Sequence, residues 1–200
     1  LFIYVVVLMT AFNFYSHGTS DLYPTFLEVQ HHLSTHAVGI IAIVYNIGAL
    51  IGGIFFGALS EQFGRRHTIV LAALLALPII PLWAFSEGPV LLATGAFLMQ
   101  FMVQGAWGIV PVHLNELSPA TARGTFPGFT YQLGNLLASA NATIQAGIAS
   151  SHGGNYGLAL GLVGGIVAVA VAVLAWFGRE RKGVSFTALE AMPEPARSIL

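Results

Sequence analysis

The chain consists of long apolar runs separated by short polar segments. The runs are each about 20 residues long, which is the length that an α-helix needs to cross the hydrocarbon core of a bilayer. A turn-rich segment at 149–157 divides the last long uncharged stretch into two. The pattern therefore predicts an all-α integral membrane domain with six transmembrane helices, at about 1–23, 36–59, 67–85, 89–114, 126–148 and 156–178. A polar tail follows at 179–200, and we expect it to be disordered.

Composition supports a membrane protein over a soluble one. Hydrophobic residues make up 56% of the 200 residues and charged residues only 8%, against about 25% charged in soluble domains. A soluble chain of this length could not bury so much apolar surface. The net charge of −1 and the lack of a basic run exclude a nucleic-acid partner. The absence of cysteine excludes disulfides and thiolate metal sites.

No cofactor and no bound metal are expected. His31, His32 and His36 gather in one predicted loop, but Glu28 is the only carboxylate near them in sequence, so we interpret them as a solvated group. Intramembrane proteolysis would need paired aspartates, a Ser–His dyad or a His-Glu-x-x-His zinc motif. The chain has one aspartate and no such zinc motif, and Ser16 and His17 point to different sides of a helix. An enzyme is therefore not predicted.

The cations indicate how the spans are oriented. With the spans above, every lysine and arginine falls on the same side of the membrane, and the loops on the other side contain none. Under the positive-inside rule, both ends of the segment are cytoplasmic, which we place at a plasma membrane. The cations are Arg65, Arg66, Arg123, Arg179, Arg181, Lys182 and Arg197.

Glycines recur at four-residue spacing in two of the predicted spans. Small residues at this spacing allow close approach of helix backbones in lipid, so we interpret them as packing faces. They are Gly48, Gly52, Gly53 and Gly57 in the second span, and Gly157, Gly161 and Gly165 in the sixth.

The loop between the second and third spans, GALSEQFGRRH at 57–67, resembles the signature of the major facilitator superfamily. Glu61 replaces its usual aspartate, and Gln62 its usual basic residue. In that superfamily the signature follows the second helix of each six-helix half, and a tail follows the last span here. The resemblance thus implies the C-terminal half of a twelve-helix carrier, with a missing N-terminal half as its partner. The gating residues it suggests are Glu61, Gly64, Arg65, Arg66, Glu116 and Arg123.

A narrower resemblance covers NFYSHGTSDLYPT at 13–25 and the segment 113–139. Both are similar to the sialate:proton symporter family, in its lactate and pyruvate permease branch, whose first helix of the second half contains Asn-x-x-Ser/Thr-His-x-Ser/Thr-Gln-Asp-x-x-x-Thr. Ser20 replaces the glutamine. The resemblance implies proton-coupled transport of a small carboxylate. The matching residues are Asn13, Ser16, His17, Thr19, Asp21 and Thr25.

The spacing of Asn13, His17 and Asp21 can also be interpreted physically, independently of the family resemblance. Successive members are displaced by only about 40° around a helix, so they form one stripe. An ionised group within the membrane costs at least about 2.5–3.5 kcal/mol, so the stripe must face a partner or a water-filled cavity. A histidine changes charge near physiological pH, which proton coupling requires. The alternatives are a solvated Asp21 at the outer interface and a packing role for His17.

Amides are the other candidates inside the spans. Gln104 and Asn135 are the best candidates for a cavity wall, while cross-linking between helices is the alternative for each amide, including Gln100. No lysine or arginine lies inside a span, so a cation for an anionic substrate would come from the missing half. Glu116 and Arg123 are interpreted as an inner gate or a static interfacial pair.

We therefore predict a fragment of a proton-coupled lactate or pyruvate symporter. A sialic acid or other organic-acid symporter is the alternative within the same superfamily. A six-span protein acting as a homodimeric channel or half-size transporter is the alternative from another class.

Overall fold

The structure is a computed structural model, and it describes residues 1–181. Residues 182–200, most of the predicted tail, lie outside the described part. Within it the chain forms helices and connecting turns and contains no strand. The elements in chain order are α1 (Phe2–Ser20), α2 (Tyr23–Thr25), the π-helix η1 (Phe26–Gln30), α3 (Thr35–Phe63), α4 (Arg65–Ala76), η2 (Leu77–Ile79), α5 (Ile80–Ala84), α6 (Pro89–Leu117), η3 (Ala120–Ala122), α7 (Phe126–Ala138), α8 (Asn141–Ser151) and α9 (Tyr156–Phe177).

Four helical runs in the described part are long and apolar enough to cross a membrane. They are α3, the continuous run Arg65–Ala84 that comprises α4, η2 and α5, then α6, and α9. They coincide with the predicted second, third, fourth and sixth spans.

The other two predicted spans do not form a single helix that is both long and apolar enough to cross a membrane. The physical reason differs between the two. The first, α1, has polar residues in its last two turns that lower its mean hydropathy. The predicted span 126–148 is divided into α7 and α8, which are individually too short. The division falls at Ser139 and Ala140, two small residues that form a turn between α7 and α8.

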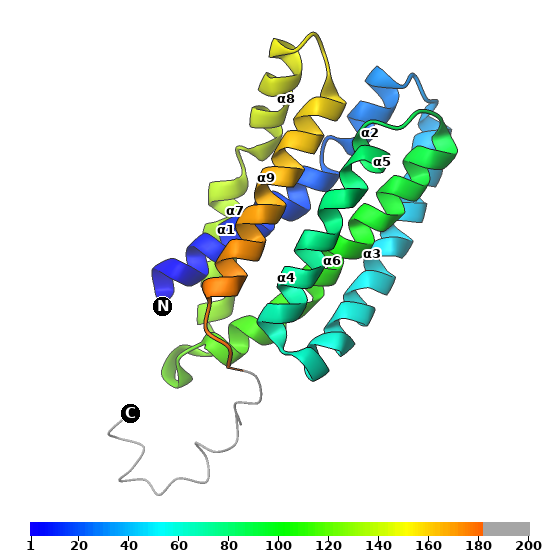
Figure 1. Cartoon of the computed structure of the whole chain (residues 1–200). Coiled ribbons are helices and arrows are strands. Elements are labelled where there is room, and N and C mark those ends of the chain that lie inside the picture. The colour runs from blue at the N-terminus through cyan, green and yellow to red at the C-terminus, as the bar shows by residue number, and fades with distance from the viewer. Residues whose placement is uncertain (182–200) are drawn as a thin grey trace, which may run out of the picture.

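The bundle has two distinct ends (Figure 1). The N-terminus, the α3–α4 turn, the α6–α7 connection and the end of α9 lie together at one end. The connections α2–α3, α5–α6 and α8–α9 lie at the other. The cations of the described part therefore share one end, as the charge pattern predicted: Arg65, Arg66, Arg123, Arg179 and Arg181.

Glycines set the closest helix contact, between α3 and α6. A Cβ on Gly48 would overlap the backbone carbonyl of Phe97, and one on Gly52 would overlap that of Phe101. The predicted packing face is confirmed at these positions. Gly57 differs, because nothing lies within 4 Å of its Cβ position.

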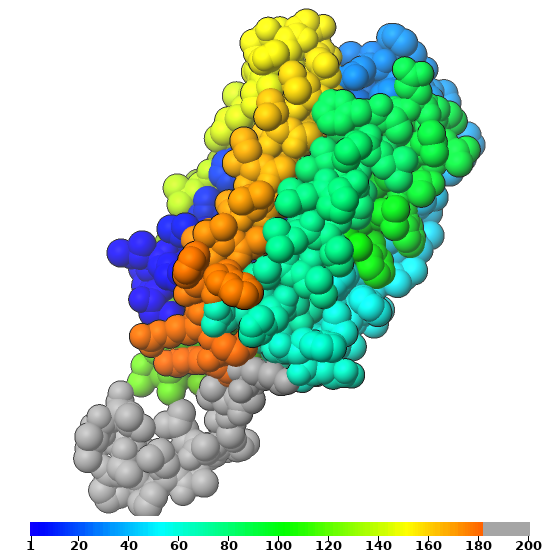
Figure 2. All heavy atoms as spheres, in the orientation of Figure 1, coloured from blue at the N-terminus to red at the C-terminus, as the bar shows by residue number. Residues whose placement is uncertain are grey.

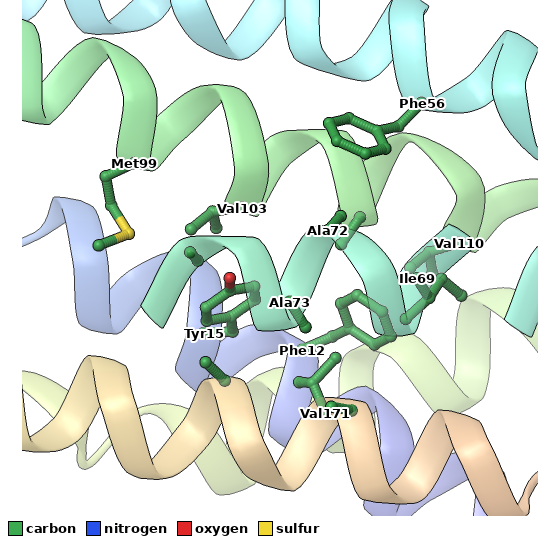
Figure 3. Close-up of a cluster of buried hydrophobic side chains, with 14 of the residues drawn as sticks. Phe12, Tyr15, Phe56, Ile69, Ala72, Ala73, Met99, Val103, Val110 and Val171 are labelled. Carbon is green, nitrogen blue, oxygen red and sulfur yellow. The ribbon is translucent and has the colours of Figure 1, made fainter. Parts of the chain in front are cut away.

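The core lies where α1, α4, α6 and α9 meet (Figure 3). Phe12 and Tyr15 of α1 pack there with Ile69 of α4, Val103 of α6 and Val171 of α9, all of them buried. Figure 2 shows α9 lying along α4 and α5 on one face of the molecule. This packing fixes the last turns of α1 against α6, where the polar residues are.

Candidate functional site

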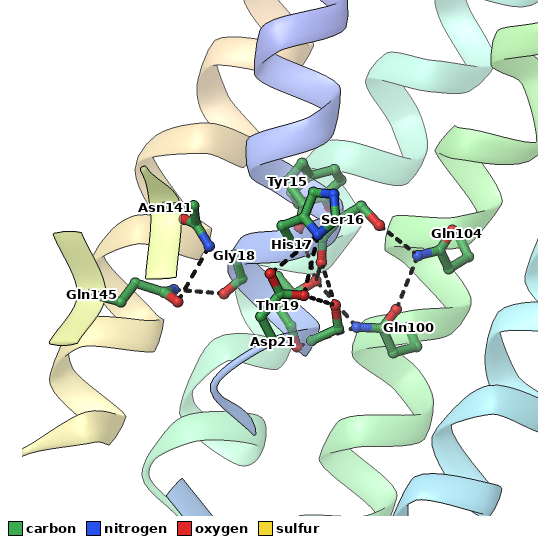
Figure 4. A network of polar contacts seen from close by, with 11 residues as sticks. Tyr15, Ser16, His17, Gly18, Thr19, Asp21, Gln100, Gln104, Asn141 and Gln145 are labelled. Atoms are coloured by element: carbon green, nitrogen blue, oxygen red, sulfur yellow. Dashed lines mark hydrogen bonds and ion pairs between the residues drawn. The ribbon is translucent and has the colours of Figure 1, made fainter. Parts of the chain in front are cut away.

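Two amides of α6 bind the polar end of α1 (Figure 4). Gln104 Nε2 donates to Ser16 Oγ at 2.9 Å and to Gln100 Oε1 at 3.4 Å. Gln100 Nε2 donates to Thr19, reaching Oγ1 at 3.1 Å and the carbonyl oxygen at 3.2 Å. Ser16 and Gln104, both predicted as site residues, thus lie together. Gln100 has the cross-linking role that the sequence left open for every amide.

His17 and Asp21 form a pair one helical turn apart. His17 Nδ1 lies 3.1 Å from Asp21 Oδ2 and 3.2 Å from Oδ1, and both side chains are 41% exposed. Ser20 Oγ donates to the same carboxylate at 3.2 Å. The pair is accessible to a solute and to protons, unlike the buried residues around it.

Asn13 lies apart from this pair. Its side chain is 1% exposed, and Nδ2 donates to the carbonyl oxygen of Met9 at 2.8 Å. Two steps of about 40° rotate it by about 80° from Asp21, onto the packed side of α1. Asn13 therefore bonds its own helix, and the exposed part of the predicted stripe is the His17–Asp21 pair.

The two remaining predicted residues make no side-chain hydrogen bond within the described part. Thr25 is half-buried at the last position of α2. Asn135 is half-buried on α7, one turn after Tyr131, whose ring centroid lies 6.0 Å from that of Trp107. Trp107 lines an open cavity beside α1, and Asn135 lies one helical turn from Tyr131, the residue that contacts it.

An open cavity of about 650 Å³ lies beside the polar end of α1. Ser20 of α1 borders it, and α6 contributes Gln100, Gln104 and Trp107. The opposite wall is α3, with Tyr45 and Asn46. These two were not among the predicted site residues, although they stand out as a polar pair within the apolar run IIAIVYNIGAL. Amides, hydroxyls and an indole thus line one space, with His17–Asp21 adjoining it through Ser20.

At the cationic end of the bundle, Arg65 holds Glu116. Arg65 Nε lies 3.3 Å from both Glu116 carboxylate oxygens, and Nη2 lies 3.2 Å from Oε1. Both side chains are 4% exposed. Arg65 Nη1 also lies 2.8 Å from Oε1 of Glu61, which is 65% exposed. The partner of Glu116 is therefore Arg65, on the first turn of α4, where the sequence had suggested Arg123, which lies between η3 and α7.

Arg66 ties α4 to the end of α9. Its guanidinium donates to the carbonyl oxygens of Ala175, at 2.9 Å, and Trp176. A cation at the last carbonyls of a helix is favourable because they carry its negative dipole end. The backbone N–H of Arg66 donates to Glu180 Oε2 at 3.0 Å. Gly64, with φ +91°, provides the turn that ends α3 and starts α4.

The cross-link by Gln100 can be tested by stability. Gln100→Leu removes its bonds to α1, so we expect the free energy of unfolding to fall by roughly 0.6–1.7 kcal/mol, measured by SDS titration in mixed micelles. Gln132→Leu is the matched control, since Gln132 is exposed on α7 and has no side-chain hydrogen bond within residues 1–181. Equal losses in the two variants would contradict the cross-link.

The sequence is similar to known proteins over most of its length. Residues 2–197 match the family described as sugar (and other) transporters. The chain is 41% identical over 153 residues to a carboxylic acid transporter protein homolog of Saccharomyces cerevisiae, covering 76% of this chain and 25% of that protein. It is 33% identical to a putative metabolite transport protein of Bacillus subtilis over 74% of this chain and 30% of the relative. Polyol transporter 5 of Arabidopsis thaliana is 33% identical over 69% of this chain and 26% of the relative.

The fold has a counterpart among solved structures. The crystal structure of a D-xylose-proton symporter superposes with a TM-score of 0.62 and 22% identity, covering 99% of this chain and 52% of that one. The chain thus spans about half of that carrier and 25% to 30% of the two curated relatives named first. The match over 2–197 leaves one conclusion: the chain belongs to the sugar (and other) transporter family, within the major facilitator superfamily.

Proposed function

We propose that this chain is part of a proton-coupled symporter for small organic acids, with lactate and pyruvate as the expected substrates. The observation that carries the proposal is the exposed His17–Asp21 pair, 3.1 Å apart, beside a cavity with amides on its walls. The relative named as a carboxylic acid transporter protein homolog supports the acid class. The finer assignment to the lactate and pyruvate branch rests on the pattern at 13–25.

Proton coupling follows from the charges of the pair. Protonating the imidazole of His17 turns a net negative pair into a neutral one, because Asp21 contributes one negative charge. An anionic carboxylate then enters the cavity with less repulsion, and loss of the proton favours its release. Gln104 and Asn46 supply amide groups at the cavity for the carboxylate or a hydroxyl of the substrate.

The fixed positive charge for a carboxylate is proposed to come from another part of the carrier. In the described helices, arginine occurs only at the start of α4, where Arg65 is held by Glu116 and Arg66 by the end of α9. A missing N-terminal six-helix half is the expected source. We propose that the cationic end of the bundle faces the cytoplasm at a plasma membrane, on the positive-inside rule.

Uptake of radiolabelled lactate tests this function. We would express the protein from its full gene in a strain without lactate permeases, and measure uptake against external pH for the native protein and His17→Ala at matched expression. We expect native uptake to rise as external pH falls, and the variant to lose at least about tenfold of the rate, about 1.4 kcal/mol of barrier.

His36→Ala is the control, because His36 is an exposed histidine in the first turn of α3. Unchanged, pH-dependent uptake in His17→Ala would reduce His17 to a packing residue. Absence of lactate uptake by the native protein would reject the substrate, and sialic acid would be tested next. Lactate that only equilibrates, without accumulation under a proton gradient, would favour the channel or half-size transporter.

Sugar or polyol transport is a second candidate, and the cavity lining favours it. Gln100, Gln104 and Asn46 with Trp107 form a wall suited to hydroxyl groups, because amides both donate and accept hydrogen bonds. A polyol transporter is among the relatives. Uptake of labelled xylose or sorbitol in the same strain decides between the two, since this candidate predicts sugar uptake that lactate does not inhibit.

A further inference from the structure

The cationic end of the bundle contains a buried histidine that the fold does not use. His113 lies on the last turns of α6 and is 1% exposed. Neither Nδ1 nor Nε2 has a hydrogen-bond partner among the described residues. Leaving a buried polar group unsatisfied costs about 1–3 kcal/mol, so such a residue calls for an explanation.

Two carboxylates lie within reach of this imidazole. Each of the three residues His113, Glu116 and Glu180 offers one possible metal-ligand atom, and these three atoms lie within 4.8 Å of one another. Glu116 is one turn after His113 on α6, and Glu180 is three residues past the end of α9. Glu180 Oε2 accepts the backbone N–H of Arg66, while Oε1 is buried and has no partner among residues 1–181. A free imidazole nitrogen and a free carboxylate oxygen thus meet at the same place.

We propose that His113, Glu116 and Glu180 bind a divalent transition-metal ion, for which zinc is the best match, and that the ion ties the chain after α9 to the end of α6. One imidazole and two carboxylates are typical zinc ligands, with metal–ligand distances of about 2.0–2.2 Å. Tetrahedral ligands at that distance are about 3.3 Å apart, so small side-chain rotations must bring the three atoms closer. A water molecule would complete the coordination.

The guanidiniums of Arg65 and Arg66, beside the proposed site, already have partners of their own. Arg65 is already paired with Glu61 and Glu116. The guanidinium of Arg66 is directed to the carbonyls at the end of α9. The carboxylates of Glu61, Glu116 and Glu180 thus stand against the guanidiniums of Arg65 and Arg66, while Arg179 and Arg181 flank Glu180 along the chain. A divalent ion between His113, Glu116 and Glu180 would lie against two carboxylates and would still leave Glu116 close to Arg65.

Metal titration of the purified protein in detergent tests the site. We expect calorimetry to show one Zn²⁺ per chain, and Co²⁺ in its place to give the visible absorption bands of a tetrahedral ion. His113→Phe and Glu180→Gln should each weaken Zn²⁺ binding by at least about tenfold. His152→Ala and Glu28→Gln are matched controls at the other end of the bundle, and should bind as the native protein does.

The variants also separate metal binding from folding. His113→Phe replaces two unsatisfied nitrogens by an apolar ring of similar shape, so its thermal midpoint without metal should equal or exceed the native value. Added Zn²⁺ should raise the midpoint of the native protein and leave that of the variant unchanged. A native protein that binds no Zn²⁺ at micromolar concentration, or binding that both ligand variants retain, would overturn the proposal.

Discussion

Gly52→Ala is expected to lower the free energy of unfolding by at least about 2 kcal/mol, although alanine is the better helix former. The added methyl group would overlap the carbonyl oxygen of Phe101 and lie 2.8 Å from two further backbone atoms of α6. Backbone atoms cannot rotate away, so α3 and α6 must separate by about 1 Å or more to restore carbon contacts near 3.5 Å. Overpacking of this kind costs about 1–3 kcal/mol or more, and separation also weakens the packing that closely approaching backbones gain in lipid.

Gly57→Ala is the matched control on the same helix. Nothing lies within 4 Å of its Cβ position, so the substitution adds helix propensity without a clash. We expect it to leave stability unchanged or to raise it by up to about 1 kcal/mol. Unfolding by SDS in mixed micelles measures both variants against the native protein. The same effect from both substitutions would mean that helix propensity, and not the α3–α6 contact, decides the outcome.

The apolar runs predicted helices well because burial in lipid requires every backbone group to bond within its own helix. Length alone therefore located the spans that became α3, α6 and α9. Length gave no sign of the division within 126–148, because the break between α7 and α8 contains no proline or charge that would mark it. Helix ends set by packing against neighbours leave no local signal.

The candidate site was predictable in part for similar reasons. His17 and Asp21 are four residues apart on one helix, so sequence spacing alone brings them together. The partners of Ser16 and Glu116 depend on how α1, α4 and α6 pack against one another. The spacing of residues along the chain does not predict this packing. Glu116 was expected near Arg123, seven residues away along the chain, but the fold presents it to Arg65, which is 51 residues away.

The buried pair of Arg65 and Glu116 gives the second large prediction. Glu116→Gln leaves the guanidinium of Arg65 4% exposed and without its buried counter-charge. Breaking a buried ion pair by removing one partner costs about 3–5 kcal/mol, and the remaining contact with Glu61 places our expectation near 3 kcal/mol, measured by SDS titration. Glu61→Gln should cost less than about 1 kcal/mol, because Glu61 is 65% exposed and water screens its pairing.

Replacing both partners separates the charge from the packing. In Arg65→Met with Glu116→Leu no buried charge is left unpaired, so most of the stability lost in Glu116→Gln should return. If the double variant instead loses as much as the single one, the hydrogen bond from Arg65 Nη1 to Ser60 Oγ, at 2.7 Å, and the shape of the pair hold this end together. Recovery of stability without recovery of uptake would show that the pair is retained for transport, because a static interface would work equally well with apolar side chains.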